Sequence, residues 1–297
     1  MTSSPASTRP ISTLVGHGGV PLALRCLGSL STMSAAPVAF QIHDDGTLTG
    51  DDLSRLREAL PVAAIIGREE ADLRARERLR GFPACLRYRE RHVLALKLFD
   101  VVFFAQGDAV AYVDTDVLFL KRFAYLWPVL GDDEAGIFMQ DHQPAYALRP
   151  WHLPLLGRIR LPKALNTGVF LWKKEAWDPD LLEWFLGRNW AVFERFPFWL
   201  EQTCWAVLAG RVATRSWDRT QVVVVKDAAS LTPAVVAAHF TSPVRALLPL
   251  EAETAGKAAG PDGLKLRHGR APRISMAGFA VAGAQRFLRR RLPAGRT

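Results

Sequence analysis

The chain has 297 residues, of which 49% are hydrophobic and 23% are charged. This length fits one large α/β domain or two small ones, and the composition excludes a wholly disordered protein. No run approaches the roughly 18 consecutive apolar residues of a membrane-spanning helix. The first ten residues hold one Arg and no apolar run, so we expect no secretory signal. Three isolated cysteines suit neither a disulfide framework nor a zinc ribbon, and we therefore expect a cytoplasmic protein.

Positive charge is concentrated at one end of the chain. Lys and Arg number 38 against 29 Asp and Glu, which gives a formal net charge of +9. Residues 265–297 carry nine basic residues and no acidic residue, so residues 1–264 are electrically balanced. This balance argues against a basic groove for nucleic acid, and we expect no nucleic-acid partner. The basic end is suited to contact with an anionic surface.

Strands alternate with helices in the first part of the chain. Residues 1–10 are rich in Ser, Thr and Pro and are expected to form a disordered leader. The expected order is then strand 11–15, a helix ending near residue 30, strand 38–42, helix 51–60 and strand 63–66. Thr49 is placed to cap helix 51–60, which has acids in its first turn. Alternation of this kind is typical of a parallel sheet covered on both faces.

The middle of the chain contains strongly apolar segments. Residues 68–91 include eight arginines interleaved with acids, which favours solvated helical faces. A buried helix is expected over 92–104, a buried strand over 109–113 and a short strand over 117–120. The pattern then predicts strand 164–172, helices 178–190 and 197–210, and strands 221–225 and 235–240. We expect one domain over 11–252, a linker over 253–273 and a basic amphipathic tail over 274–297.

Two Asp-x-Asp tripeptides occur in the chain, and their surroundings differ. Asp178-Pro179-Asp180 precedes a helical run, so we interpret its acids as helix caps. Asp114-Thr115-Asp116 follows the apolar strand AVAYV and precedes the apolar run VLFL. Two carboxylates between buried strands must be paired or bound to a cation, and ligands bind at the carboxyl ends of strands in open α/β sheets. Mn²⁺ or Mg²⁺ prefers such oxygen ligands, and pairing with Arg is the alternative.

Four segments resemble, in order, the landmarks of GT-A glycosyltransferases. The resemblance is greatest to the retaining family-8 type, which includes glycogenin-like and bacterial galactosyltransferase-like enzymes. These segments are LKLFDVVFFAQGDAVAYVDTDVLFL, LNTGVFLW, EQTCWAVLA and AAHFTSPVR, and the resemblance extends over residues 11–250. It implies an α/β GT-A fold in which helices flank a mixed, mostly parallel sheet. It also implies retaining transfer of a sugar from a UDP-linked donor to a glycan, a lipid-linked sugar or a small molecule.

The resemblance also implies which residues bind the metal and the donor. Asp114 and Asp116 match the metal-binding D-x-D, and His239 matches the histidine that supplies the third protein ligand to Mn²⁺ or Mg²⁺. The residues implied to contact the donor are Lys97, Asn166, Thr167, Gly168 and Arg245. A metal at this site, with Arg245 and Lys97, would neutralise the charge that grows on the leaving nucleoside diphosphate.

Glu201 and Gln202 match the family's D-Q pair, which contacts the transferred sugar, and we expect them to be the catalytic residues. Glu stands where the family has Asp, which changes the reach of the carboxylate. Two mechanisms for retention are compatible with the sequence. In one, a protein group acts on the far face of the sugar, and in the other, a front-face reaction needs no protein nucleophile. The family's H-x-x-G-x-x-K motif is also altered, since Ser242 replaces its Gly and Arg245 replaces its Lys. Arg retains the ability to clamp a diphosphate.

Two other function classes fit parts of the pattern. A sugar nucleotidyltransferase can share the sheet and the metal chemistry, but Gly16–Gly19 is too short for its phosphate loop and lacks a basic partner. A degenerate, non-catalytic nucleotide-sugar-binding protein would explain the changes at Ser242 and Arg245. The intact Asp114, Asp116 and His239 argue against that alternative.

Residues 274–292, ISMAGFAVAGAQRFLRRRL, predict an interfacial membrane anchor. The apolar part is too short to span a bilayer, and basic residues near anionic lipid contribute about 1 kcal/mol each. The basic residues are Arg286, Arg289, Arg290 and Arg291, and the residues expected to insert are Phe279, Val281, Phe287 and Leu288. A disordered tail, or a helix packed on the body, is the alternative. We therefore expect a cytoplasmic enzyme that is peripheral on the inner face of the membrane.

Overall fold

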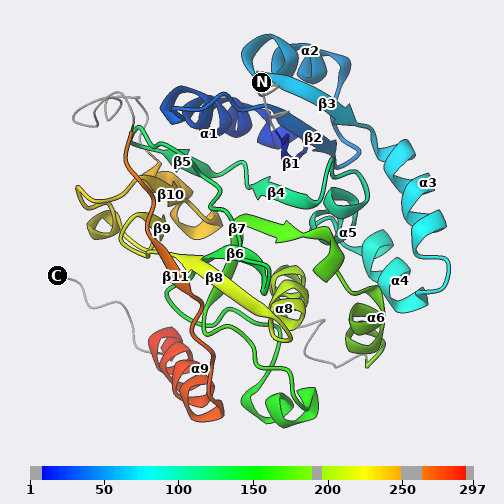
Figure 1. The fold of residues 1–297 in the computed structure, drawn as a ribbon, viewed down its shortest axis with the longest axis vertical. Helices are drawn as coiled ribbons and strands as arrows, with labels where there is room; N and C mark the ends of the chain where they lie inside the picture. Colours follow the sequence, from blue (N-terminus) through cyan, green and yellow to red (C-terminus); the bar gives the residue numbers. More distant parts are fainter. Residues whose placement is uncertain (1–8, 189–195, 249–262, 292–297) are drawn as a thin grey trace.

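The strands of the computed structural model form one eleven-stranded sheet that is covered by helices (Figure 1). The structure describes residues 9–188, 196–248 and 263–291, with side chains up to residue 284 except that of Pro243. Within these residues six strand pairs are parallel and four are antiparallel. The prediction of a mixed, mostly parallel sheet is therefore confirmed.

The strands lie in the order β3–β2–β1–β4–β7–β6–β9–β10–β5, and β8 pairs with both β6 and β11. Their bounds are β1 (Ile11–Val15), β2 (Phe40–Asp44), β3 (Val62–Ile66), β4 (Ala109–Val113), β5 (Val117–Phe119), β6 (Glu134–Gln140), β7 (Leu165–Lys173), β8 (Ala213–Trp217), β9 (Val222–Val224), β10 (Ala237–His239) and β11 (His268–Arg270). The helices are α1 (Val20–Met33), α2 (Gly50–Ala59), α3 (Arg68–Arg78), α4 (Pro83–Arg91), α5 (Ala95–Phe103), α6 (Pro179–Gly187), α8 (Pro197–Ala209) and α9 (Met276–Arg291).

Alternation of side chains along β4 divides the core between the two faces of the sheet. Val110 and Tyr112 pack into a cluster with residues of α4, α5, α6 and α8. Ala109, Ala111 and Val113 pack into a second cluster with residues of α1 and α2. Since both faces are covered, β4 is buried along its whole length, which explains its continuous apolar sequence.

Two helix starts follow from the capping residues that the sequence provides. The Thr49 side chain accepts a hydrogen bond from the Asp52 backbone N–H, and the Asp52 carboxylate accepts one from the Thr49 N–H, which completes a capping box. Asp178 accepts from the backbone N–H of Leu181 at 2.8 Å and caps α6. The interpretation of the second Asp-x-Asp as a helix cap is confirmed.

Arg89 on α4 differs from the solvated helical face predicted for residues 68–91. Its side chain is buried and forms an ion pair with Asp100 at 2.8 Å, and it also pairs with Asp72. Because α4 packs against both α3 and α5, the guanidinium is enclosed among their acids. Burying this charge is tolerated since two carboxylates accept its N–H groups.

Residues 263–273 belong to the packed fold, so the prediction of a linker is wrong for this part of 253–273. Strand β11 pairs antiparallel with β8, and the Ala124 N–H donates to the Leu264 carbonyl at 3.0 Å. Arg273 donates to the carbonyls of Ala209 and Val212 and so caps the end of α8. The rest of the expected linker, residues 1–8 of the expected leader, and residues 292–297 lie outside the described residues.

Helix α9 packs on the body of the protein. Phe279 is fully buried, and its ring lies edge-on to Tyr146 with 6.2 Å between centroids. Its expected insertion into a membrane is therefore wrong, while Val281 is more than half exposed. The side chains of Phe287, Leu288 and the four arginines lie outside the described residues. No described helix has the length and apolar character needed to cross a membrane.

The strand register brings distant segments to the end of β4. Val113, the last residue of β4, lies opposite Val169 of β7. Val117, the first residue of β5, lies opposite His239 of β10. The short turn between β4 and β5 is therefore flanked by β7 on one side and by the end of β10 on the other.

Candidate metal and donor site

The turn Asp114-Thr115-Asp116 is fixed through its backbone. The Asp114 N–H donates to the Gly168 carbonyl at 2.7 Å, and the Phe240 N–H donates to the Asp116 carbonyl at 2.9 Å. These bonds tie the turn to β7 and to the segment that follows β10. The two carboxylates are consequently held beside His239.

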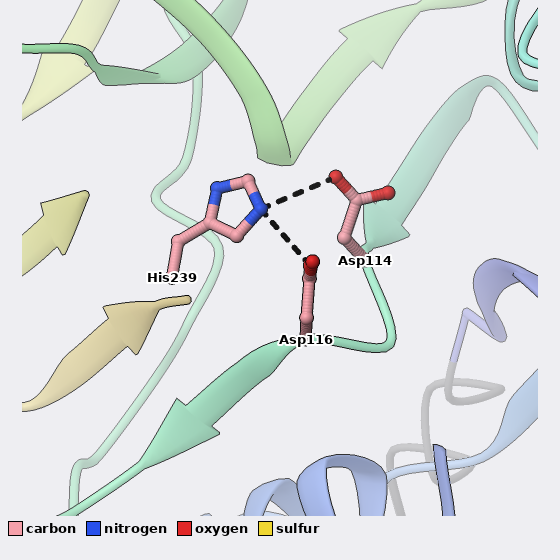
Figure 2. Close-up of side chains that lie close together, drawn as sticks. All are labelled: Asp114, Asp116 and His239. Carbon is pink, nitrogen blue, oxygen red and sulfur yellow. Dashed lines mark ion pairs between the residues drawn. The ribbon is translucent and has the colours of Figure 1, made fainter. Parts of the chain in front are cut away.

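Asp114, Asp116 and His239 converge on one point (Figure 2). His239 Nε2 lies 2.9 Å from Asp116 Oδ1 and 3.8 Å from Asp114 Oδ2. One ligand atom from each side chain lies within 4.8 Å of the others, and this is the one such group found among the described residues. Asp116 and His239 are buried, whereas Asp114 is partly exposed. The group is therefore compact and opens on the side of Asp114.

Asn166 fixes the tautomer of His239. The Asn166 Oδ1 accepts from the Gly168 N–H at 2.8 Å, which identifies it as the amide oxygen. The Nδ1 of His239 lies 3.1 Å from the same oxygen and must donate to it. In neutral His239 the lone pair therefore lies on Nε2, which faces the two carboxylates. Orientation of a ligating histidine through its other nitrogen is usual at metal sites.

This donor set fits a divalent cation. A lone pair on Nε2 repels a carboxylate oxygen at 2.9 Å unless a proton or a metal ion lies between them. Burial lowers the pKa of His239, but Asp116 and Asp114 raise it more, so that it lies above its usual value. For Asp116 the directions are reversed: burial raises its pKa, but His239 and Arg245 bring the pKa below its usual range. Two carboxylates and one imidazole suit Mn²⁺, and Mg²⁺ is the second candidate.

Each carboxylate also has a cationic neighbour. The Lys97 ammonium donates to both Asp114 oxygens, at 2.9 and 2.8 Å, and the Tyr112 hydroxyl donates to Oδ1 at 2.9 Å. Burial lowers the pKa of Lys97, but Asp114 and Glu201 more than compensate, so the ammonium stays charged. Arg245 donates to Asp116 Oδ2 at 2.8 Å. Pairing with a basic residue and a cation-binding geometry thus occur together at this site.

Glu201, on α8, interacts electrostatically with Lys97 and Asp114. Its carboxylate accepts a hydrogen bond from the Thr167 hydroxyl at 3.0 Å, and the side chain is buried. Burial raises the pKa of Glu201 to about 7, although the Lys97 charge opposes this shift. Glu201 is therefore a carboxyl group that changes charge near neutral pH. Groups of this kind are common at functional sites.

Gln202 points to a different partner. Its side-chain amide donates to the Ala145 carbonyl at 2.9 Å, and it is buried with Glu201 on the same helix. The neighbouring Thr203 hydroxyl accepts from the Ala147 N–H at 2.8 Å. Gln202 thus holds the segment that follows β6, and the structure gives it no contact with the Asp-Asp-His group.

The structure brings most of the predicted site residues together. Asp114, Asp116 and His239 meet, and the residues in contact with them are Lys97, Arg245, Asn166 and Gly168. Thr167 connects to Glu201, and Gln202 lies further away. Tyr112 was not predicted as a site residue; it lies in β4 two residues before Asp114, a spacing that directs both side chains to the same face when the backbone is extended.

No protein-family model matches the sequence, and the search of curated proteins found no match. Solved structures with a similar fold include two glycosyltransferases, each matched over about four fifths of this chain. Mouse xyloside xylosyltransferase 1 has a TM-score of 0.53 at 12% identity, covering 80% of this chain and 99% of that one. The galactosyltransferase LgtC, solved with donor and acceptor sugar analogues, has a TM-score of 0.54 at 15% identity, covering 82% and 92%. The chain therefore shares the fold of these glycosyltransferases, as the resemblance to GT-A enzymes predicts.

Proposed function

We propose that this chain is a metal-dependent glycosyltransferase that takes a sugar from a nucleotide sugar, with UDP as the nucleotide. The observation that carries the proposal is the convergence of Asp114, Asp116 and His239 at the end of the strand β4, in a fold shared with glycosyltransferases. The acceptor is proposed to be a carbohydrate or a lipid-linked sugar. LgtC was solved with a donor and an acceptor sugar analogue, which supports the same kinds of ligand here.

Asp114, Asp116 and His239 would hold Mn²⁺ or Mg²⁺. When bound, such an ion neutralises the charge that develops on the leaving diphosphate. Lys97 keeps Asp114 in place through both of its oxygens, and Arg245 carries a second positive charge at the exposed edge. Asn166 keeps Nε2 of His239 available as a ligand. These residues would act by orienting ligands and by supplying positive charge, which stabilises the negative charge that develops on a leaving phosphate.

Glu201 and Gln202 are proposed to act on the transferred sugar, with Thr167 and Gly168 on the donor side. Glu201 interacts electrostatically with both Lys97 and Asp114 and is hydrogen-bonded to Thr167. Its neutral form can donate a hydrogen bond to a sugar hydroxyl, and its charged form can stabilise a positive anomeric centre. Retention of the anomeric configuration is proposed from the resemblance to the family-8 type.

A thermal-unfolding assay tests the metal and donor together. UDP, GDP, CDP and ADP are each added with Mn²⁺ or with a chelator, and a nucleotide at 100 times its dissociation constant should add about 2.7 kcal/mol. We expect UDP to stabilise the protein only when Mn²⁺ is present. The Asp116→Asn variant should lose this stabilisation, while Asp180→Asn, in the helix-capping Asp-x-Asp, should keep it. Equal stabilisation in the chelator would contradict the metal site.

Turnover of the donor separates the proposed activity from its two rivals. A transferase releases UDP and a sugar product of one anomeric configuration, which NMR spectroscopy of the reaction identifies. Consumption of a nucleoside triphosphate and a sugar phosphate would instead show a nucleotidyltransferase. Binding of UDP-sugars without any release of UDP, in the presence of Mn²⁺ and candidate acceptors, would indicate a non-catalytic binding protein.

We also propose that the end of the molecule bearing α9 contacts an anionic membrane surface. α9 packs beside the 3₁₀ turn Pro150–Leu156, where Trp151 and Leu155 are at least half exposed. Met276 and Val281 of α9 are also more than half exposed. Exposed Trp beside a basic segment suits the interface of a bilayer. Trp151 and Leu155 are therefore proposed to contact the membrane in place of Phe279, which is buried.

A further inference from the structure

The charged side chains that contact one another at the metal site balance in pairs. Lys97 is bound to Asp114 through two oxygens, at 2.9 and 2.8 Å, and Arg245 is bound to Asp116 at 2.8 Å. Two carboxylates therefore face two cations. A divalent ion added to this group brings two positive charges to carboxylates that are already paired with cations, which disfavours the ion alone.

The two cations differ in their freedom to move. Lys97 is buried within α5, and its ammonium lies 4.7 Å from the centre of the Tyr112 ring. Arg245 lies on the 3₁₀ helix Ser242–Leu247 at the surface, and its side chain is 51% exposed. Its ion pair with Asp116 uses one guanidinium nitrogen. Arg245 is thus the cation that can leave its carboxylate without disturbing the core.

A nucleoside diphosphate supplies what the metal-bound group lacks. It carries the negative charge that offsets the divalent ion, and its phosphate oxygens match the planar fork of a guanidinium. We propose that Arg245 leaves Asp116 and pairs with the diphosphate when the nucleotide binds. The metal ion and the nucleotide then bind cooperatively, and each binds weakly without the other. This inference rests on the proposed function and adds to it a positioning role for Arg245 in coupling the two ligands.

The exchange has two measurable consequences. Removing Arg245 takes a positive charge away from Asp116, so Mn²⁺ alone should bind more tightly. It also removes the group that the diphosphate captures, so UDP should raise the affinity for Mn²⁺ by a smaller factor. If Arg245 only bound the diphosphate, its removal would give only the second effect. If Arg245 only oriented Asp116, its removal would weaken the binding of Mn²⁺ in the absence of UDP.

The test measures Mn²⁺ affinity by electron paramagnetic resonance, without UDP and at saturating UDP. The variants are Arg245→Ala, Arg245→Lys and the control Arg211→Ala, which removes another half-exposed arginine that pairs with an aspartate at 2.8 Å. In Arg245→Ala we expect several-fold tighter Mn²⁺ binding without UDP and a coupling factor reduced by ~10-fold. Arg245→Lys should lie between, because Lys lacks the planar fork. Arg211→Ala should match the wild type.

Linkage provides an internal check, because Mn²⁺ must raise the affinity for UDP by the same factor as UDP raises that for Mn²⁺. Circular dichroism confirms that each variant is folded. An unchanged coupling factor in Arg245→Ala, or Mn²⁺ binding that is no tighter without UDP, overturns the exchange and leaves the proposed function intact. Absence of Mn²⁺ binding by the wild type, with and without UDP, overturns the metal site itself and the exchange with it.

Discussion

A Cβ atom on Gly168 would lie 2.6 Å from Cε1 of His239 and closer still to Nδ1. The imidazole is therefore packed directly against the backbone of β7, where no other residue leaves room for it. The same stretch of β7 accepts the Asp114 N–H and supplies Asn166, which holds Nδ1. Gly168 was expected on the donor side from the family pattern, and in the structure it also makes room for the imidazole of His239.

The substitution Gly168→Ala should weaken Mn²⁺ binding by ~10- to 100-fold, because the new methyl group displaces the His239 ring and breaks its bond to Asn166. Titration of Mn²⁺ by electron paramagnetic resonance measures this. Gly187→Ala is the control, since its new Cβ would meet nothing closer than 3.9 Å. Equal Mn²⁺ affinity in the two variants would show that His239 is not a ligand.

Glu201 should make the stability of the protein fall as the pH rises. The pKa of Glu201 is about 7 in the folded protein against an ordinary 4.5, so the folded state binds more protons between these values. The free energy of unfolding should therefore decrease by about 3 kcal/mol across this window and then level off. Glu201→Gln should lack this decrease and exceed the wild type in stability at pH 8. Urea unfolding from pH 4.5 to 8 tests this, with the exposed Glu58→Gln as control, and parallel curves for wild type and Glu201→Gln would rule it out.

Substitution of Gln202 by Ala should lower the rate of sugar transfer by ~10-fold or more, while the affinity for UDP stays within about twofold. The rate should fall because Gln202 is proposed to act on the transferred sugar. The affinity for UDP should hold because Gln202 bonds to Ala145 and not to the Asp-Asp-His group. Steady-state kinetics and isothermal titration with UDP give the two quantities. An equal loss of both would mean that α8 only supports the nucleotide pocket.

Phe279 should be a structural residue of the core. Replacing it with Ala removes a fully buried ring beside Tyr146 and should lower the free energy of unfolding by about 3–5 kcal/mol. Val281→Ala, on the exposed side of the same helix, should cost much less than Phe279→Ala. Chemical denaturation of both variants checks this, and similar small losses would show that α9 contributes little to the fold.

The membrane proposal calls for a test that keeps α9 attached, because removal of the helix would also remove Phe279 from the core. Changing Arg286, Arg289, Arg290 and Arg291 to Gln should abolish co-sedimentation with vesicles rich in phosphatidylserine. The control changes Arg55, Arg57, Arg78 and Arg80 to Gln, which removes the same charge from exposed positions. Binding of the wild type should fall with added salt. Similar binding by both fourfold variants would refute a specific basic anchor.

The part of the fold that could be predicted is the part whose signal is local. The strand over 109–113 was expected with the bounds that β4 has, because both of its faces are buried and its sequence is apolar throughout. β6 and β8 were not predicted. In β8 the alternate residues Thr214 and Ser216 are buried, and Arg215 is neutralised by Glu134 of β6, so apolarity does not mark the strand.

The site residues, too, were predictable where the sequence signal is local and not where it depends on tertiary contacts. Asp114 and Asp116 were identified from their place after a buried strand, and His239 from its resemblance to a family motif. The bond of Asp114 to Lys97 and that of Asp116 to Arg245 depend on contacts between residues that are 17 and 129 positions apart in sequence. The burial of Arg89 has the same origin, since its acidic partners lie on two other helices. Pattern alone does not indicate which charged residues become enclosed.

The late position of β11 and α9 in the sequence has a consequence for how the chain folds as it is synthesised. Arg273 donates to the carbonyls of Arg160, 113 residues earlier, and of Ala209 at the end of α8. Until the ribosome has made β11 and Arg273, the outer edge of β8 and those carbonyls lack these partners. The nascent chain must therefore carry an open strand edge from the synthesis of β8 until that of β11, and such an edge is a site of aggregation. Ribosome-bound chains halted before residue 263 should be far more sensitive to protease than the released full-length chain.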